Sequence, residues 1–255
     1  MSYTIDEANT ERQKLLGALL NPLTRPILER IQLRPGARVL DLGCGQGNAT
    51  RMLAEVYSPA ECVGLEYDES LVKYARAHPD NPPSVRFEQG DATRLPYPDD
   101  SFDLVFTRYL LVHLADPTAV IREMLRVAGN GYVVAYEPDC SCDFTWPPSW
   151  AYEKMSAFWS LFPDPLTGRK LVHHARAAGA TVIDCGAIQG MDTGQHYRRI
   201  YRLSVEAMRP AILATGKLSE SEYEALLAEM IRVEQAPDVV CFKMPDMWVI
   251  ARASA

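Results

Sequence analysis

The sequence contains few cysteines for its length, and none of them are paired at metal-binding spacing. The 255 residues include six cysteines, and no two of them form a CxxC step. This number is too small for a disulfide scaffold in a chain of this length, and structural zinc sites use paired CxxC steps. We therefore expect free thiols and no metal site.

Long apolar runs are also absent. No stretch approaches the ~18 to 20 apolar residues that a helix needs to cross a bilayer. The first residues, MSYTIDEANTERQ, lack the basic-then-apolar order of a secretory signal. The sequence therefore predicts no membrane span and a cytoplasmic location.

Basic residues are fewer than acidic residues. Lys and Arg number 26 against 33 Asp and Glu, which gives a net charge of −7. Affinity for nucleic acid comes mainly from clustered Lys and Arg, so this balance argues against a broad phosphate-binding surface, and no nucleic-acid partner is expected. A small ligand that is neutral or cationic fits this balance better.

Apolar runs that are typical of strands alternate with amphipathic helical stretches through the first half of the chain. Such alternation predicts a mainly parallel sheet covered by helices on both faces. Residues 9–31 carry apolar residues at helical spacing around Pro22 and Pro26, which predicts two short helices before the main fold. Strands are expected at 37–43, 61–67, 85–92, 102–109, 131–138, 181–190 and 241–253, the last broken at Met244-Pro245, and helices at 48–57, 68–78, 117–128, 166–180 and about 196–235.

A glycine-rich turn follows the first predicted strand, in the segment VLDLGCGQGNAT. Gly43, Gly45 and Gly47 let the backbone turn tightly and approach a ligand. The spacing differs from the G-x-G-x-x-G of nicotinamide-binding loops, because Asn48 stands where the third glycine would fall. Asp41, two residues before the turn, would repel a pyrophosphate and attract an ammonium group, so the ligand should be cationic at this point.

Two further carboxylates follow the next two strands. Glu66 ends the second strand 23 residues after Gly43, where an acidic side chain can accept both hydroxyls of a ribose. Asp91 can accept a hydrogen bond from an adenine amino group, with the backbone at Ala92 meeting the ring edge. Adenosine plus ammonium, without phosphate, describes S-adenosylmethionine. The alternative for each carboxylate alone is a solvated strand end or a helix cap.

Together these segments resemble the class I S-adenosylmethionine-dependent methyltransferases, in the small-molecule branch related to the ubiquinone and menaquinone methyltransferases. The resemblance rests on VLDLGCGQG, the strand-end Glu66, GDA with LPYPDDSFDLV, and YLLVHLADP, and it covers residues 36–139 most clearly. It implies an α/β, Rossmann-like, seven-stranded and mainly parallel sheet with helices on both faces and the last strand antiparallel. It also implies S-adenosylmethionine as cofactor and S-adenosylhomocysteine as product. The residues assigned to the cofactor are Asp41, Gly43, Gly45, Gly47, Asn48, Glu66, Tyr67, Asp91, Ala92 and Arg108.

Three residues are candidates for catalysis. His113, a few residues after the fourth strand, is the best candidate for a general base, because imidazole titrates near neutral pH. Glu137, at the end of the fifth strand, either orients a substrate or forms the polar end of that strand. His196, with Tyr197 and Tyr201, is a candidate pocket group. The alternative for His113 is a packing role between strand and helix.

We expect an N-terminal helical cap over residues 1–35 and a methyltransferase domain over 36–255. The aromatic segment at about 140–165 is either a lid over the acceptor or an ordinary core helix. The helical insertion at about 194–236 either completes a closed cavity or forms a homodimer contact. Tyr3 and Arg12 belong to a segment that precedes the sheet and is able to close over the cofactor.

The leading functional hypothesis is methyl transfer to an oxygen, nitrogen or carbon of a small apolar or aromatic molecule, by in-line displacement in a desolvated pocket. A protein or RNA methyltransferase is a second hypothesis, against which the acidic charge and the aromatic segments count. A third is a methyltransferase-like protein that binds the cofactor without methyl transfer, because the binding motifs are clearer than any catalytic group.

Overall fold

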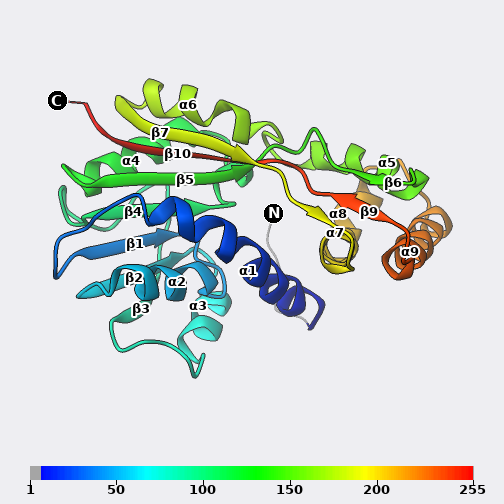
Figure 1. Ribbon diagram of the computed structural model, residues 1–255, viewed down its shortest axis with the longest axis horizontal. Coiled ribbons are helices and arrows are strands. Elements are labelled where there is room, and N and C mark those ends of the chain that lie inside the picture. Colours follow the sequence, from blue (N-terminus) through cyan, green and yellow to red (C-terminus); the bar gives the residue numbers. More distant parts are fainter. Residues whose placement is uncertain (1–6, 255) are drawn as a thin grey trace.

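The computed structural model describes residues 7–254, and its centre is one seven-stranded sheet (Figure 1). All neighbouring strands are parallel except β10, which runs antiparallel to β5 on one side and to β7 on the other. This confirms the expected Rossmann-like sheet with its antiparallel last strand. The order across the sheet is β3 (Val85–Gln89), β2 (Glu61–Glu66), β1 (Arg38–Leu42), β4 (Leu104–Arg108), β5 (Tyr132–Pro138), β10 (Asp246–Ala253) and β7 (Ala180–Ile188).

Alternate residues of the central strands pack into two hydrophobic layers, one on each face of the sheet, because successive side chains of a strand point to opposite faces. Leu40 and Leu42 of β1 join a cluster with α4 (Pro117–Ala128) and α6 (Thr167–Ala177). Val39 of the same strand joins a second cluster with α1 (Glu7–Leu28) and α2 (Asn48–Tyr57). Helices therefore cover both faces, as expected, and α3 (Glu69–Arg76) packs near the β3 edge.

The N-terminal region differs from the expectation of two short helices. A single helix, α1, runs through both Pro22 and Pro26. Each proline removes one backbone donor, a local cost that favours a break. Ile27 and Leu28 are almost fully buried against the sheet, so tertiary packing outweighs the local preference.

A second group of elements lies beyond the carboxyl ends of the parallel strands (Figure 1). Its core combines aromatic and aliphatic side chains from several helices with a small three-stranded sheet. The region expected to be helical at 196–235 is confirmed as three helices. The elements are β6 (Phe144–Trp146), α5 (Trp150–Ser156), η2 (Ala157–Leu161), β8 (Met191–Asp192), α7 (His196–Ala207), α8 (Arg209–Ala214), α9 (Glu220–Gln235) and β9 (Val240–Phe242).

None of the helices within residues 7–254 has the length and apolar character that a membrane crossing requires. In the same part of the chain, no three His, Cys, Asp or Glu side chains gather as a metal-binding group. All six cysteines are free thiols, as predicted.

Candidate functional site

The glycine turn joins β1 to α2 at the carboxyl edge of the sheet. Gly43 has φ of 67° and Gly47 has φ of 81°, in the left-handed region that glycine adopts without strain. A Cβ on Gly43 would lie 2.9 Å from Leu110 Cδ1, and one on Gly47 would lie 2.5 Å from Phe87 Cζ. The backbone at both positions therefore requires glycine, which explains the spacing seen in the sequence.

A large cleft opens beside this turn, with an empty volume of about 1820 Å³ including open solvent. Its wall contains most of the residues assigned to the cofactor, together with several from α1. Gly47, Asp91 and Ala92 are not part of this wall, and the Asp91 carboxylate accepts hydrogen bonds from Thr93 N (2.8 Å) and Thr93 Oγ1 (2.7 Å). The assigned residues in the wall are Asp41, Gly43, Gly45, Asn48, Glu66, Tyr67 and Arg108.

Glu66 ties the glycine turn to the start of α3. Its Oε2 accepts the Gly45 amide at 2.9 Å, and its Oε1 accepts the Asp68 amide at 3.1 Å. An ionised carboxylate has about four acceptor sites, so these two bonds leave room for ligand hydroxyls. Glu66 therefore shapes the cleft and retains the capacity to bind a diol.

Asp41 lines the cleft and is almost fully buried. Burial raises the pKa of Asp41 to about 7, although a hydrogen bond from Thr50 Oγ1 (2.6 Å) and the charge of Arg108 act in the opposite direction. Arg108 itself donates to Thr24 Oγ1 at 3.0 Å and to Asn21 Oδ1 at 2.9 Å, both on α1. Arg108 therefore fastens α1 across the end of β4 and adds positive charge near Asp41.

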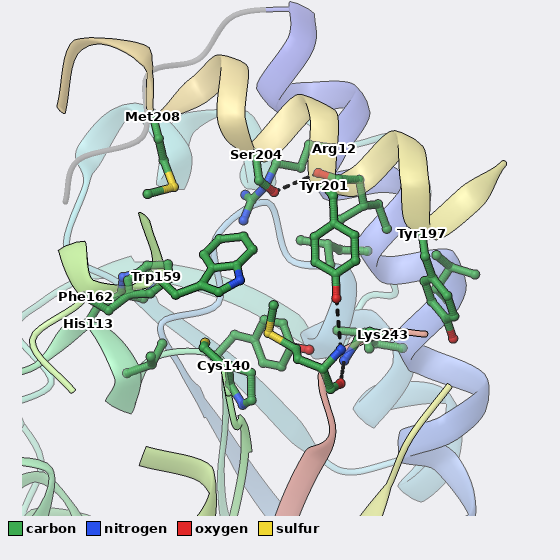
Figure 2. A pocket seen from close by; sticks show the side chains of 18 residues that line it. Arg12, His113, Cys140, Trp159, Phe162, Tyr197, Tyr201, Ser204, Met208 and Lys243 are labelled. Atoms are coloured by element: carbon green, nitrogen blue, oxygen red, sulfur yellow. Dashed lines mark hydrogen bonds between the residues drawn. The ribbon is translucent and has the colours of Figure 1, made fainter. Parts of the chain in front are cut away.

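A second cavity, of about 670 Å³ with its open mouth included, adjoins the cleft (Figure 2). Its lining is mainly apolar and aromatic and comes from α1, the segment after β4, η2, α7 and the segment before β10. We call it the acceptor cavity. Five residues line both the cleft and the acceptor cavity: Arg12, Leu16, Leu20, Tyr109 and His113.

The aromatic segment after β5 divides between the two alternatives, lid and core. Trp159 and Phe162 line the acceptor cavity with nearly parallel rings whose centroids are 6.0 Å apart. Tyr152 and Phe158 are buried in the core of the second group of elements, beyond the carboxyl ends of the parallel strands. Phe144, Trp146 and Trp150 are exposed.

The helical insertion contributes directly to the acceptor cavity, because α7 supplies Tyr197, Ile200, Tyr201 and Ser204 to its lining. His196, the first residue of the same helix, lines neither hollow. Its side chain is 62% exposed and lies 3.8 Å from Asp192. The two tyrosines named with His196 are thus in the cavity, and the histidine is outside it.

His113 ends the 3-10 turn η1 (Leu111–His113) and lies where the two hollows meet. Its ring packs edge-on against Phe162, with centroids 5.0 Å apart. Burial, followed by the charge of Arg12, lowers the pKa of His113 to about 4. The expectation that it titrates near neutral pH is therefore wrong, and the imidazole is neutral under physiological conditions.

Glu137 lies outside the walls of both hollows, although its position at a strand end made it a catalytic candidate. It is fully buried and accepts three consecutive amides: Leu110 N and Leu111 N at 2.9 Å, and Val112 N at 3.2 Å. Burial raises the pKa of Glu137 to about 8, against the lowering effect of these bonds. The structure thus gives Glu137 the task of holding the turn that carries His113.

One group at the site escaped the sequence analysis. Asp246 accepts hydrogen bonds from the Tyr109 hydroxyl, from Tyr136 OH (2.8 Å) and from Lys243 Nζ (2.5 Å). Tyr109 has φ of 60°, a conformation that is rare and strained for a bulky residue. The only signal in the sequence was the broken strand at Met244-Pro245, which brings Lys243 and Asp246 into reach of each other.

Comparisons with known proteins agree with this geometry. A family model described as a methyltransferase domain matches residues 33–201. Phosphoethanolamine N-methyltransferase 3 of Arabidopsis thaliana is 30% identical over 129 residues, which are 50% of this chain and 26% of that protein. An O-methyltransferase of Penicillium expansum is 30% identical over 190 residues, which are 72% of this chain and 65% of that protein. The matched region is therefore less than two thirds of either relative.

Among solved structures, phosphoethanolamine N-methyltransferase 2 of Haemonchus contortus, in complex with S-adenosyl-L-methionine, has a TM-score of 0.58. The two chains are 20% identical, and the match covers 92% of this chain and 53% of that one. At this level of identity the likeness supports the fold.

Proposed function

This chain belongs to the methyltransferase-domain family, and from that premise we propose that it transfers the methyl group of S-adenosylmethionine to a small apolar or aromatic molecule. The observation that carries the proposal is the shared wall: the cleft beside the glycine turn and the acceptor cavity meet at Tyr109 and His113. A donor in the first hollow and an acceptor in the second would lie side by side at this boundary.

The residues of the cleft suit such a cofactor. Gly43 lines the cleft at a bend with positive φ, so a ligand can approach its backbone without meeting a side chain. Asp41 provides the charge complement of an ammonium group, and Glu66 provides acceptors for the ribose hydroxyls. Asp91 and Ala92, which follow β3, remain our assignment for adenine.

S-adenosylmethionine supplies a methyl group on a positively charged sulfur. A lone pair of the acceptor atom forms the new bond to the methyl carbon, the C–S electron pair returns to sulfur, and S-adenosylhomocysteine leaves. The apolar lining of the acceptor cavity excludes water and aligns the acceptor. Where the acceptor is O–H or N–H, neutral His113 at the boundary accepts a hydrogen bond from it and orients it, and the low pKa of His113 leaves the released proton to solvent.

The decisive experiment combines calorimetry with a transfer assay. S-adenosylhomocysteine should bind the purified protein, and isotopically labelled S-adenosylmethionine should label at least one member of a panel of phenols, amines, quinols and apolar carboxylates. Tight cofactor binding with no labelled small molecule would instead favour a binding protein without methyl transfer. Label on protein or RNA would contradict the small-molecule assignment.

Glu66→Ala is expected to raise the dissociation constant for S-adenosylhomocysteine about 10- to 100-fold, because a hydrogen bond to a charged group contributes roughly 1.5 to 3 kcal/mol. Calorimetry measures this directly. Glu55→Ala is the matched control, since Glu55 is an exposed residue of α2 paired with Arg25. The Glu55→Ala variant should bind S-adenosylhomocysteine with the same affinity as the native chain. Equal affinity in both variants would remove Glu66 from the cofactor site.

Affinity for the cofactor is expected to increase with pH through the pKa of Asp41. That pKa is raised to about 7, so the carboxyl group is mostly neutral at pH 6 and attracts an ammonium group only when it ionises. The dissociation constant for S-adenosylhomocysteine should fall about tenfold between about pH 6 and pH 8, as the ionised fraction rises by that factor. Asp41→Asn should bind more weakly and give a flat profile. A native profile that is equally flat would show that Asp41 does not meet the ammonium group.

A further inference from the structure

The lining of the acceptor cavity includes Tyr201, whose hydroxyl group is only half engaged. The hydroxyl oxygen accepts a hydrogen bond from Met244 N at 2.9 Å, and nothing within residues 7–254 accepts the hydroxyl hydrogen. Burial raises the pKa of Tyr201 well above its usual value, so the hydroxyl keeps this hydrogen. Tyr201 therefore retains one hydrogen-bond donor that the fold does not use.

Lys243, which also lines the cavity, supplies a second donor. Its ammonium has three N–H groups, of which one donates to Asp246 Oδ1 at 2.5 Å and another to Met244 O at 3.0 Å. The third has no hydrogen-bond acceptor in the part of the chain that the structure describes. The remaining contact of Nζ is with the ring of Tyr109, whose centroid is 5.6 Å away, close to the limit of a cation–π interaction.

Met244 brings the two donors to the same wall of the cavity. Its N–H donates to Tyr201 and its carbonyl accepts from Lys243, and Figure 2 shows the Tyr201 hydroxyl pointing toward Lys243. The ring of Tyr201 packs edge-on against Tyr152, with centroids 6.1 Å apart, and lies 5.9 Å from the ring of Trp159. Both donors are thus fixed before a ligand binds, so binding does not have to order them.

We propose that the methyl-accepting molecule carries a carbonyl group, and that Tyr201 and Lys243 donate hydrogen bonds to its oxygen. This inference rests on the proposed function and names the substrate class of the same site. A carbonyl oxygen accepts two hydrogen bonds and has no hydrogen of its own, so two donors satisfy it completely. A hydroxyl group would need a further acceptor for its hydrogen, and an amine would bring more donors to a wall that already consists of donors.

A neutral carbonyl fits this wall better than a carboxylate does. Asp246 already balances the charge of Lys243, and its Oδ1 lies 2.5 Å from the ammonium. A second carboxylate bound to the same ammonium would lie close to Asp246 and be repelled by it. The expected ligands are therefore ketones, esters, amides or quinones whose apolar body packs against the rings of Trp159 and Phe162.

The carbonyl serves recognition, and a different atom of the molecule receives the methyl group. Tyr201 and Lys243 belong to the described lining of the acceptor cavity and not to that of the cleft, whereas Tyr109 and His113 line both. The boundary at which we place methyl transfer is formed by Tyr109 and His113. A change at Tyr201 should therefore alter the choice of acceptor molecule and leave cofactor binding intact.

The test compares ketones with the alcohol and the amine of the same shape. The sets are 2-acetylnaphthalene with 1-(2-naphthyl)ethanol and 1-(2-naphthyl)ethylamine, 1-tetralone with 1-tetralol and 1-aminotetralin, and benzophenone with benzhydrol and benzhydrylamine. Equilibrium dialysis measures the affinity of each for the native chain saturated with S-adenosylhomocysteine. At least one ketone should bind about tenfold more tightly than its alcohol and its amine, because an unsatisfied buried donor is costly. If no ketone binds, or none is preferred, the proposal is wrong.

Tyr201→Phe keeps the ring and removes the hydroxyl, so the preference for the ketone should fall about threefold or more, the effect of one lost hydrogen bond. Lys243→Met should lower the preference in the same way. Tyr223→Phe is the matched control, because Tyr223 is a buried tyrosine of the same cluster outside the cavity lining, and its hydroxyl donates to Val205 O at 3.2 Å. The control should keep the native preference.

A preference for ketones that is unchanged in both Tyr201→Phe and Lys243→Met would overturn the proposal, since other groups would then recognise the carbonyl. Affinity for S-adenosylhomocysteine should stay within about twofold of native in Tyr201→Phe, because Tyr201 is not part of the described cleft wall. Failure of S-adenosylhomocysteine to bind the native chain would contradict the proposed function independently of the carbonyl site.

Discussion

Glu137→Ala is expected to lower the free energy of unfolding by about 3 kcal/mol, because it leaves two buried amides and one partly buried amide without an acceptor, and each costs about 1 to 3 kcal/mol. These amides belong to Leu110, Leu111 and Val112, which form the start of the turn that ends at His113. Turnover should also be lost, since the boundary between cleft and cavity loses its support. Denaturant unfolding and the labelled-methyl assay measure the two effects.

Glu137→Gln is the informative companion to this variant. Its amide oxygen can still accept two of the three N–H groups, so the loss of stability should be clearly smaller than in Glu137→Ala. The alternative role of Glu137, contact with the substrate, predicts a different pattern. A Glu137→Ala protein as stable as the native chain but devoid of transfer activity would support that alternative and contradict the structural role.

The central sheet and the glycine turn were accessible from sequence because their signals are local. The apolar run of β1, the three glycines and the acidic strand end at Glu66 lie within thirty residues of chain, and each carries its own physical requirement. Positive φ at Gly43 and close approach at Gly47 follow directly from the turn that connects a strand to a helix. Local rules therefore predicted the glycine turn and the strand-end carboxylate, which belong to the cleft assigned to the cofactor.

The acceptor side depends on contacts between distant residues, which no local pattern encodes. Arg12 meets Ser204 across 192 positions, and Tyr109 meets Asp246 across 137. Glu137 resembles Glu66 in sequence, since both lie at the end of a parallel strand. Three amides donate hydrogen bonds to Glu137, whereas Glu66 lines the open cleft. Burial, rather than residue type, separates the structural carboxylate from the ligand-binding one.

The same reasoning explains why the position of His113 was predicted correctly and its pKa was not. His113 was chosen because it follows a strand, and the structure does place it at the boundary between the two hollows. Its pKa, however, is set by burial and by Arg12, which comes from a different element. A sequence indicates where an imidazole stands along the chain, and the surrounding fold determines whether it carries a proton.

Asp246→Ala is expected to have the second large effect, a loss of about 3 to 5 kcal/mol in unfolding free energy, because it leaves the buried ammonium of Lys243 without its carboxylate. The hydroxyls of Tyr109 and Tyr136 lose their acceptor in the same step. Tyr109 is then no longer held in its strained conformation, so the wall shared by the cleft and the acceptor cavity should loosen. Thermal unfolding should begin on the order of 10 °C lower for a chain of this size.

The double variant Asp246→Ala/Lys243→Met separates charge from packing. Removing both members of a buried ion pair is often close to neutral, whereas removing one is costly, so the double variant should recover much of the lost stability. Transfer of labelled methyl should not recover in the double variant, because Tyr109 still lacks the partner that holds it in the wall shared by the cleft and the acceptor cavity. A double variant as unstable as Asp246→Ala alone would show that the tyrosine hydrogen bonds, and not the ion pair, account for the contribution of Asp246.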